Sequence, residues 1–547
     1  MGGDHDFDWI VIGSGFGGSV SALRLAEKGY RVAVLESGRR YEDEDFAKTT
    51  WNARRYYWLP RLGLRGIFRM TLFKDVFVVS GCGVGGGSLG YANTLYRPRP
   101  GSAFYRDPQW SELDDWESAL GPHYDTAEQM LGVTTYEGEG PGDRLMRELA
   151  EEMGVPETYS TTRVGVFFGE PGETVPDPYF GGDGPPRAGC IRCGACMVGC
   201  RYNAKNTLMK NYLWFAERKG VEVRPERTVA EIRPLGAADG SDGYAVTSDR
   251  SGAWVRKDRQ TLTARGVVVA AGALGTNQLL QRCRLGGSLP RLSERIGYLV
   301  RTNSEAISAV TTKDDRHDFT KSIAITSSFY PDPDTHIENV TYGRGADSIS
   351  MLFTILTAAG SSFTRPLKFL RSAVRHPLVF ARTLWPHKWS RRTVILLTMQ
   401  TLDNSIRLRP KRNLLGLGPR LQTQEDADNP NPRFIEIADK VTRRAAEKLD
   451  ATPQTGVTEA LLNIPTTAHI MGGAVIGERP ETGVIDGHHR AFGYENLLVC
   501  DGAAIPANVG VNPSLTITAM AEHAMSHIRP RDADAAPAGS DMDVAHR

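Results

Sequence analysis

Residues 8–36 are the stretch that most constrains what this chain can fold into. They open with an unbroken apolar run at 9–12, which is typical of a strand buried on both faces. The pattern G-x-G-x-x-G follows at Gly13, Gly15 and Gly18. A helix is expected over 18–28, and a second apolar run at 31–35 ends at Glu36. This order predicts a Rossmann-like α/β unit.

Each of the three glycines in this turn has a physical role in dinucleotide binding. Gly13 permits the tight turn, Gly15 lets a pyrophosphate approach the backbone, and Gly18 lets the helix pack on the strand. The helix N-terminus offers free N–H groups and a positive dipole end to the phosphates. Glu36 lies where an acid accepts hydrogen bonds from a ribose diol, which favours FAD or NAD over NADP. The alternative is a structural turn without a ligand.

The bulk properties exclude several classes of protein. The chain has 547 residues, more than one ordinary domain, with 65 Lys+Arg against 64 Asp+Glu. This balance gives no overall field to attract nucleic acid. The polar start at residues 1–6 does not resemble a Sec signal peptide, and no apolar run reaches the roughly 18 residues that span a bilayer. We therefore expect a cytoplasmic protein.

A second glycine-rich stretch covers residues 81–90. Glycines leave backbone N–H groups accessible to a ligand, at an entropic cost in the free chain. A flexible linker is the alternative, but linkers are usually polar tracts, and this one contains Val84 and Leu89. We interpret it as a cofactor-lining loop. Its candidate binding residues are Gly83, Gly86, Gly87, Ser88 and, just beyond the loop, Asn93.

Another strand-to-glycine turn occupies residues 265–273. It predicts a strand that re-enters the nucleotide-binding sheet beneath the cofactor, with Ala271 and Gly272 at the binding edge. A short strand around Val229 is a further candidate for cofactor contact.

Residues 348–402 differ in composition from the rest of the chain, because they contain eight Lys or Arg but no Asp or Glu. Aromatic and aliphatic residues are interleaved with these basic ones. Segments of this kind can rest on an anionic membrane surface. The alternative is a helical lid whose apolar side is core and whose charged side is solvated. Either arrangement suits a lipid-like substrate.

The C-terminal part carries the chemistry. His469 is followed by two glycines, and a last buried strand at 497–500 ends at Asp501 and Gly502. Asn512 and Pro513 then open a helix, where proline suits the first turn. An acid at a strand end beside a helix N-terminus can order a flavin ribityl chain, and the helix dipole favours negative charge on a reduced flavin.

Taken together, the motifs at 13–36, 81–90, 469–473 and 501–513 resemble the glucose–methanol–choline oxidoreductases. Within that family the chain is most similar to the bacterial cholesterol oxidases that hold FAD non-covalently. The resemblance covers both ends of the chain and is weak in the middle. One departure is that the loop's asparagine is displaced to Asn93. Another is that the loop has no histidine for a covalent flavin link, so FAD should be dissociable.

The resemblance implies roles for three residues. His469 matches the active-site histidine that orients or deprotonates the substrate hydroxyl, and Asn512 matches the amide that touches flavin and substrate. Glu338 is the positional match for a carboxylate that isomerises the 5-ene ketone product, although an exposed, uninvolved glutamate is the simpler interpretation. The implied substrate is a 3β-hydroxysteroid or a similar lipid alcohol, with O₂ or another electron acceptor as co-substrate.

A cysteine run is the second departure from the family pattern. Its spacing, C-x2-C-x2-C-x3-C, is that of bacterial ferredoxins and predicts an iron–sulfur cluster on Cys190, Cys193, Cys196 and Cys200. In two-cluster ferredoxins the fourth cysteine serves the other cluster, so the fourth ligand is left open. The alternatives are reduced cysteines that pack a loop, or a zinc site. A cluster would favour a dehydrogenase over an oxidase.

These patterns imply an FAD domain built from separate segments and a substrate domain on an antiparallel sheet. The expected parts are an FAD-binding part at 1–135 with a covering excursion at 39–80, a loop-rich insert with the cysteines at 136–215, a second FAD-binding part at 216–300, a substrate domain at 301–464 with a lid at 348–402, a last FAD-binding part at 465–528, and a disordered tail at 529–547.

Two other classes of function remain open from the sequence. Some members of the family are lyases that use FAD structurally. A membrane-docked binding or electron-transfer module would need no alcohol chemistry.

Overall fold

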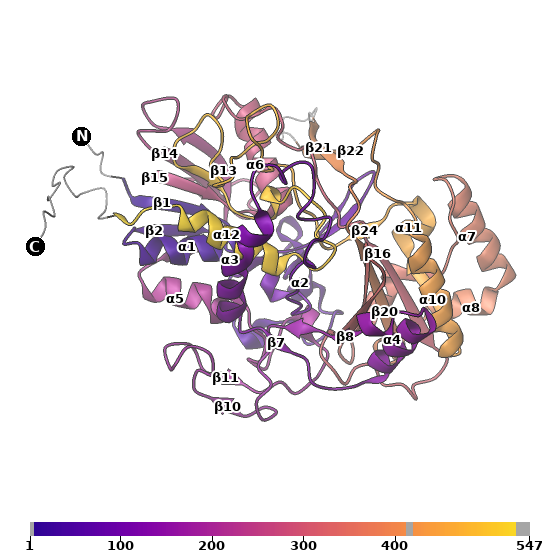
Figure 1. Ribbon diagram of the computed structural model, residues 1–547. Helices are drawn as coiled ribbons and strands as arrows, with labels where there is room; N and C mark the ends of the chain where they lie inside the picture. The colour runs from indigo at the N-terminus through magenta and orange to yellow at the C-terminus, as the bar shows by residue number, and fades with distance from the viewer. Residues whose placement is uncertain (1–4, 412–419, 532–547) are drawn as a thin grey trace, which may run out of the picture.

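The computed structural model describes residues 5–411 and 420–531 (Figure 1). Most of the tail predicted over 529–547 therefore lies outside the described residues. Two large sheets organise the chain, one at each side of the view in Figure 1.

The first sheet is the predicted nucleotide-binding unit. Four neighbouring strands run in parallel in the order β12 (Glu222–Arg224), β2 (Val32–Leu35), β1 (Phe7–Ile12) and β15 (Gln260–Val269), and β25 (Leu497–Val499) pairs with β15. Antiparallel strands β14 (Tyr244–Arg250) and β13 (Arg227–Pro234) extend it from β15. The apolar runs at 9–12 and 32–35 are buried on both faces, which confirms the expected parallel core.

Helices cover this sheet. α1 (Phe16–Glu27) packs against α12 (Ser514–Ser526) and α5 (Tyr212–Arg218), and α12 also packs against α3 (Trp116–Leu131). A buried carboxylate joins them, because Glu522 of α12 accepts hydrogen bonds from Arg24 Nε at 2.7 Å and from the Tyr212 hydroxyl at 2.7 Å. The N-terminal helix α1 and the C-terminal helix α12 are thereby held together in the helical layer over this sheet. α6 (Gly272–Leu285) follows β15 directly.

The second sheet is antiparallel throughout, as the resemblance implied. Its seven strands are, in spatial order, β19 (Phe353–Ile355), β23 (Ala451–Gly456), β16 (Ala306–Thr312), β20 (Thr393–Gln400), β18 (Thr335–Val340), β17 (Ile325–Asp332) and β8 (Ser160–Thr161). Helices α4 (Pro141–Glu152) and α10 (Glu436–Lys448) cover one face with apolar side chains. The other face is directed at the nucleotide-binding unit.

Two of the expected boundaries are wrong in detail. The segment 348–402 is not all lid, because β20 lies in the middle of the second sheet with residues 393–399 buried. A strand buried on both faces is a continuous apolar run, so its sequence resembles the lid beside it. The insert expected at 136–215 contains α4, an amphipathic helix of the substrate layer that begins at Pro141.

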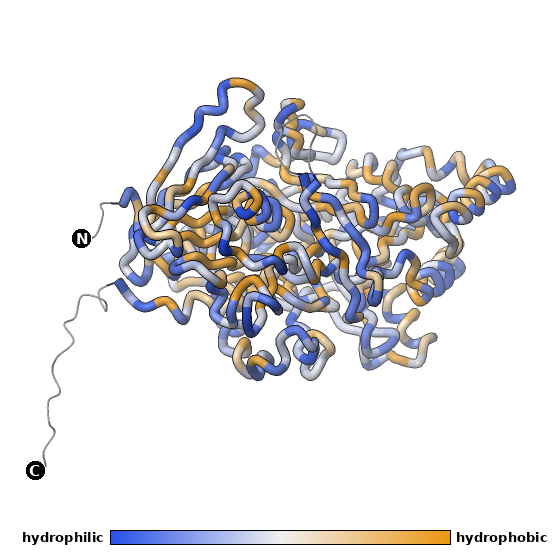
Figure 2. Tube along the Cα trace, turned by 90° about the horizontal axis from the view of Figure 1, so that it is seen from above, coloured by the Kyte–Doolittle hydropathy of each residue, from blue (hydrophilic) through white to orange (hydrophobic). Residues whose placement is uncertain are grey.

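Apart from β19, which is an edge strand of the second sheet, the helices of 348–402 form a cover at the outer edge of that sheet. It consists of α7 (Thr364–Arg375), α8 (Pro377–Thr383) and the short α9 (Trp389–Arg392). α7 and α8 lie at the end of the molecule farthest from the nucleotide-binding sheet in Figure 1, and Figure 2 shows hydrophobic and hydrophilic residues alternating there. Among the described helices, none is long and apolar enough to cross a membrane.

The covering excursion at 39–80 has more regular structure than its sequence indicated. β5 (Phe68–Leu72) and β6 (Phe77–Gly81) form a hairpin, and β24 (Thr466–Thr467) pairs with β6. Smaller elements are α2 (Ala53–Tyr56), β3 (Trp58–Leu59), β4 (Leu64–Arg65), β7 (Thr134–Thr135), β9 (Arg163–Val164), β10 (Thr174–Val175), β11 (Arg187–Ala188), β21 (Ile406–Lys411), β22 (Arg420–Glu425) and α11 (Val457–Leu462).

Candidate active site

The first glycine turn has the geometry that a dinucleotide requires. Gly13 has a φ of +102°, and a Cβ on it would lie 2.2 Å from the Ala270 carbonyl oxygen. A Cβ on Gly18 would lie 2.0 Å from the Gly13 oxygen. A Cβ on Gly15 would lie 4.0 Å from its nearest neighbour, Gly86 Cα, and no side chain caps the N-terminus of α1. The turn therefore packs tightly behind and stays open in front, which fits a pyrophosphate.

Glu36 lies at the other end of this site. Its buried carboxylate accepts hydrogen bonds from Ser14 N at 3.1 Å, Ser14 Oγ at 2.8 Å and Gly38 N at 2.7 Å. Gly83 packs on Gly38 so closely that a Cβ on Gly38 would lie 2.3 Å from Gly83 N. β13 begins beside it, since Arg227 N donates to the Glu36 carbonyl, and it carries Val229 two residues further on.

The second glycine stretch packs on the first. A Cβ on Gly86 would lie 2.6 Å from Gly15 Cα, and Gly87 lines the cavity described below. The prediction for Ser88 needs correction. Its buried hydroxyl donates to Gly85 O at 2.7 Å and accepts from Leu208 N at 3.0 Å, so it holds the loop in shape.

We expect Gly86→Ala to weaken FAD binding about tenfold or more. Overpacking of this kind costs about 1–3 kcal/mol, and 1.4 kcal/mol is a factor of about ten. A fluorescence titration of the apoprotein with FAD measures the effect. Gly101→Ala is the matched control, because Gly101 also has a positive φ, +62°, but open space around it. Equal losses in both variants would contradict the role of the Gly15–Gly86 contact.

Asp501 links the last strand to α6. It accepts hydrogen bonds from Gly272 N and Ala503 N, both at 2.8 Å, and from Thr276 Oγ1 at 2.5 Å. Burial raises the pKa of Asp501 to about 6, against the opposing effect of these hydrogen bonds. The carboxylate thus fixes the turn that contains Ala271 and Gly272 at the cavity wall. Thr276 was not anticipated from the sequence.

A cavity of about 510 Å³ connects the two sheets. One side is formed by the glycine turns, by Ala271, Gly272 and Gly502, and by Pro513 at the start of α12. The opposite side is apolar and comes from four strands of the second sheet, with Ile307, Ile325, Val340, Ile395 and Leu397. The cavity therefore has a nucleotide-facing end and an apolar end suited to a hydrophobic ligand.

His469 lines this cavity beside a carboxylate that the sequence did not reveal. Its Nδ1 is paired with the Glu305 carboxylate, whose other oxygen accepts from Ala468 N at 2.8 Å. Burial by itself lowers the pKa of the imidazole, but Glu305 outweighs it, so the pKa of His469 lies above 6.5. Because Nδ1 is engaged, Nε2 is the nitrogen available for proton transfer in the cavity.

Asn512 and Glu338 meet at the same place. The Asn512 amide donates to Glu338 Oε2 at 3.2 Å, whereas Asn512 Oδ1 and Glu338 Oε1 are buried without a hydrogen-bond partner among the described residues. Burial raises the pKa of Glu338 to about 7, although the Asn512 hydrogen bond and the charge of His469 act in the opposite direction. The structure thus brings the three predicted catalytic residues together.

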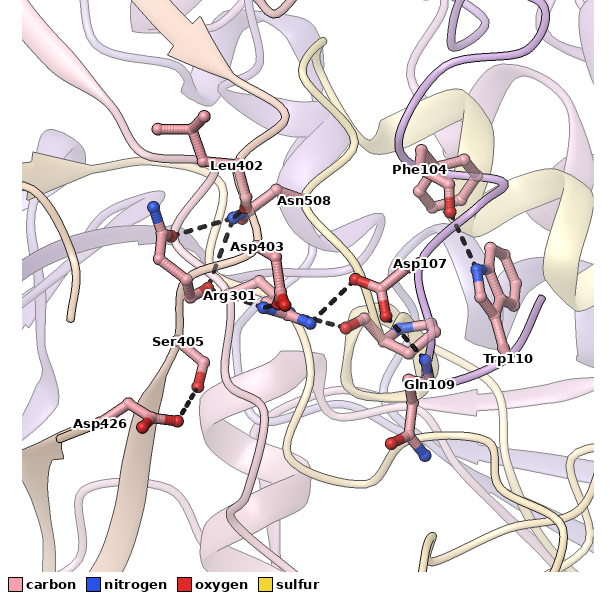
Figure 3. A network of polar contacts seen from close by, with 12 residues as sticks. Phe104, Asp107, Gln109, Trp110, Arg301, Leu402, Asp403, Ser405, Asp426 and Asn508 are labelled. Carbon is pink, nitrogen blue, oxygen red and sulfur yellow. Dashed lines mark hydrogen bonds and ion pairs between the residues drawn. The ribbon is translucent and has the colours of Figure 1, made fainter. Parts of the chain in front are cut away.

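A buried arginine connects the backbone segments that carry His469 and Asn512. Figure 3 shows the Arg301 guanidinium bonded to Asp107 at 3.0 Å and to Asp403 at 2.7 Å. Its Nε donates to Pro506 O at 2.7 Å, in the loop that leads to Asn512. Its backbone exchanges hydrogen bonds with Met471, two residues after His469. This network explains how loops distant in sequence reach one point.

Glu305→Gln is expected to move the acid limb of the pH profile of alcohol oxidation to lower pH. The base form of His469 is needed, so kcat/KM rises as pH passes the His469 pKa. Glu305 raises that pKa, and without its charge burial dominates and the pKa falls. A pH series of kcat/KM checks this. An unmoved limb would show that His469 is not the group that titrates.

The four clustered cysteines surround a second hollow, together with Asn93 and Lys205. All seven cysteines of the chain are free thiols. Asn93 needs correction as a flavin contact, because it lines this hollow and not the large cavity. Within residues 5–411 and 420–531, no three His, Cys, Asp or Glu side chains meet closely enough to hold a single metal ion.

Comparison with known proteins agrees with this geometry. Residues 8–327 match the family model described as FAD dependent oxidoreductase, and residues 420–521 match GMC oxidoreductase. Cholesterol oxidase of Mycobacterium tuberculosis (strain CDC 1551 / Oshkosh) is 51% identical over 95% of this chain and 91% of that protein. Cholesterol oxidase of Acinetobacter baumannii is 46% identical over 96% and 95%.

A solved structure shows the same fold at low identity. Pyridoxine 4-oxidase from Mesorbium loti aligns with a TM-score of 0.60 and 15% identity over 95% of this chain and 98% of that chain. On the evidence of the glycine cradle, the His469–Asn512 pair and these matches, the chain belongs to the GMC oxidoreductases and is an FAD-dependent oxidoreductase.

Proposed function

We propose that this protein oxidises the 3β-hydroxyl group of a sterol or a similar steroid to the ketone, with O₂ as the final acceptor. The observation that carries the proposal is that His469 and Asn512 both line this cavity, and that the buried Glu338 is hydrogen-bonded to Asn512 and feels the charge of His469. The 46–51% identity to two cholesterol oxidases over nearly the full length supports the choice of substrate.

The residues divide the reaction between them. His469 Nε2 accepts the proton of the substrate hydroxyl, because an alkoxide-like carbon releases hydride more readily. Bound FAD supplies the acceptor for that hydride. Asn512 orients the hydroxyl through its side-chain amide, and the apolar strands exclude water from the reacting carbon. Glu305 stabilises the protonated histidine that results, as its effect on the pKa of His469 implies.

Glu338 is assigned to isomerisation of the first product. A 5-ene-3-ketone becomes the conjugated 4-ene-3-ketone when a base takes a proton from C4 and returns it to C6. A carboxyl group with a pKa of about 7 can both accept and return a proton near neutral pH. Its Oε1 accepts no hydrogen bond from the described residues and lies 4.0 Å from His336 Nδ1.

A substrate screen tests the proposal. Cholesterol should be consumed with uptake of O₂, release of peroxide and formation of a steroid ketone. A dye acceptor run in parallel should not be required for turnover. Turnover only with the dye would indicate a dehydrogenase, and conversion of a cyanohydrin without oxidation would indicate a lyase. Oxidation of linear alcohols but not of sterols would contradict the proposed substrate.

We also propose that α7 and α8 rest on an anionic membrane from which a lipid substrate enters. Leu367, Leu370 and Val374 are exposed at helical spacing on α7, and Leu378 of α8 continues the stripe with 78% of its surface exposed. Such a stripe is normally core. Lys368, Arg371, Arg375 and Arg382 flank it, and between residues 348 and 402 there is no acid to oppose an anionic surface.

Replacing Val374 and Leu378 together by glutamate is expected to lower binding to phosphatidylserine vesicles at least about tenfold. Burial of one such side chain is worth about 1.5–3 kcal/mol, and the added acids repel the lipid. Vesicle co-sedimentation measures the effect, and turnover of detergent-dispersed sterol should be unchanged. Leu62→Glu with Val255→Glu is the matched control, at two apolar residues exposed elsewhere. Equal losses in both pairs would contradict this docking surface.

A further inference from the structure

The hollow beside the large cavity shows where the fourth cysteine of the run lies, which the cysteine spacing alone left open. Cys190, Cys193, Cys196 and Cys200 all line this one space, so the fourth cysteine has no other cluster to serve. The hollow has a volume of about 20 Å³.

In an iron–sulfur cluster each thiolate binds its own iron, so the cysteines stand around a space and do not meet at one point. The four cysteines here line one hollow in that way.

The backbone supplies a hydrogen bond to one of the sulfur atoms, because Arg192 N donates to Cys190 Sγ at 3.4 Å. Amide donors of this kind stabilise sulfur that carries negative charge.

A buried cation at the wall lacks a carboxylate. Lys205 is 2% exposed, and its Nζ donates to three carbonyl oxygens, those of Leu89, Tyr91 and Cys196. A buried charge is normally paired. A cluster with four thiolates carries net negative charge and would provide the counter-ion.

Asn93 adds a polar group at the same hollow. It is fully buried, and its side chain lies near the Cys196 thiol, although neither amide atom makes a regular hydrogen bond with the described residues. A buried amide is costly unless something accepts from it, and thiolate sulfur in the hollow would do so.

We propose that this hollow binds a four-iron, four-sulfur cluster through Cys190, Cys193, Cys196 and Cys200. The site adjoins the flavin cavity, because Met197 and Ala92 line that cavity while their neighbours Cys196 and Asn93 line this one. One layer of protein separates the two spaces. The proposal depends neither on the sterol substrate nor on O₂ as the acceptor. Iron-loaded protein that turns over with the dye and not with O₂ would keep the cluster and replace the proposed oxidase by a dehydrogenase.

Iron and acid-labile sulfide analysis of the full-length protein tests the site directly. Protein purified without oxygen, or reconstituted with ferrous iron and sulfide, should contain about four of each per chain. It should show visible absorbance beyond that of flavin, bleached by dithionite. Cys193→Ala should lose the iron and sulfide but keep FAD. Cys283→Ala is the control, because this buried cysteine lies outside the hollow.

Three results would overturn the proposal. The first is wild-type protein that holds no iron even after reconstitution. The second is one zinc per chain in place of iron. The third is Cys193→Ala with full iron content. Should that variant fail to fold, as FAD content and circular dichroism would reveal, the wild-type iron and sulfide content still decides.

Discussion

Replacing His469 by glutamine is expected to lower kcat for alcohol oxidation by about 10²- to 10⁴-fold, the usual contribution of a general base. Glutamine keeps polar atoms near the hydroxyl but cannot accept its proton at neutral pH. FAD should remain bound at wild-type stoichiometry, because His469 lies at the substrate end of the cavity and the glycine cradle at the other. Steady-state kinetics and the flavin-to-protein ratio measure both quantities.

The control for this variant is His527→Gln. His527 is exposed at the C-terminal end of α12, away from the cavity lining. It should turn over at close to the wild-type rate. A His469→Gln protein with bound FAD and full turnover would remove the proposed base and favour a function without alcohol chemistry.

Replacing Glu338 by glutamine is expected to separate the two proposed reactions. Glutamine is nearly isosteric and still offers an oxygen to the Asn512 amide, which now lies 3.2 Å from Glu338 Oε2. It cannot shuttle a proton, so isomerisation should fall by about 10²- to 10⁴-fold. Oxidation should persist, and the 5-ene-3-ketone should accumulate. Chromatography of the steroid products over time measures the ratio of the two ketones.

Glu305→Gln is the matched comparison, because it changes a neighbouring buried carboxylate that acts on His469. It should alter the pH profile of oxidation and leave the conversion of added 5-ene-3-ketone intact. If Glu338→Gln instead released the conjugated ketone in wild-type proportion, Glu338 would not be the isomerising group.

The parts that could be predicted from the sequence are those whose information is local. The turn at Gly13–Gly18 and the acid at Glu36 lie within one strand–helix–strand unit, so spacing alone indicates their geometry. The burial of residues 9–12 and 32–35 follows from apolar content for the same reason. The family resemblance implies the roles of His469 and Asn512, which stay a prediction; the structure shows that both residues line one cavity.

The parts that could not be predicted depend on contacts between distant segments. Glu305 is far from His469 in sequence and belongs to no motif. Contacts such as the backbone pairing of Arg301 with Met471 and the bond from Thr467 Oγ1 to Thr302 O bring the two segments together. Asn93 was assigned by its place after a glycine loop, yet its side chain points to the other side of that loop. A motif position gives no information about which side of a loop a residue faces.

The predicted lid at 348–402 is wrong in part because a buried strand and exposed helices share a similar composition there. β20, α7 and α8 all contain apolar residues and lack acidic ones, so composition alone predicts a single lid. Burial, not composition, separates them. The amphipathic helix α4 was not predicted, because glycines and prolines surround it in the sequence. Pro141 nevertheless occupies its first turn, where proline is favoured.

The most direct test of the account is whether the alcohol reduces the bound flavin. Holoenzyme mixed with cholesterol in the absence of oxygen should lose its visible flavin absorbance. It should do so more slowly with deuterium on C3, and far more slowly still in the His469→Gln variant. Flavin that keeps its full absorbance with every steroid alcohol tried, in protein that binds FAD, would contradict hydride transfer at this site.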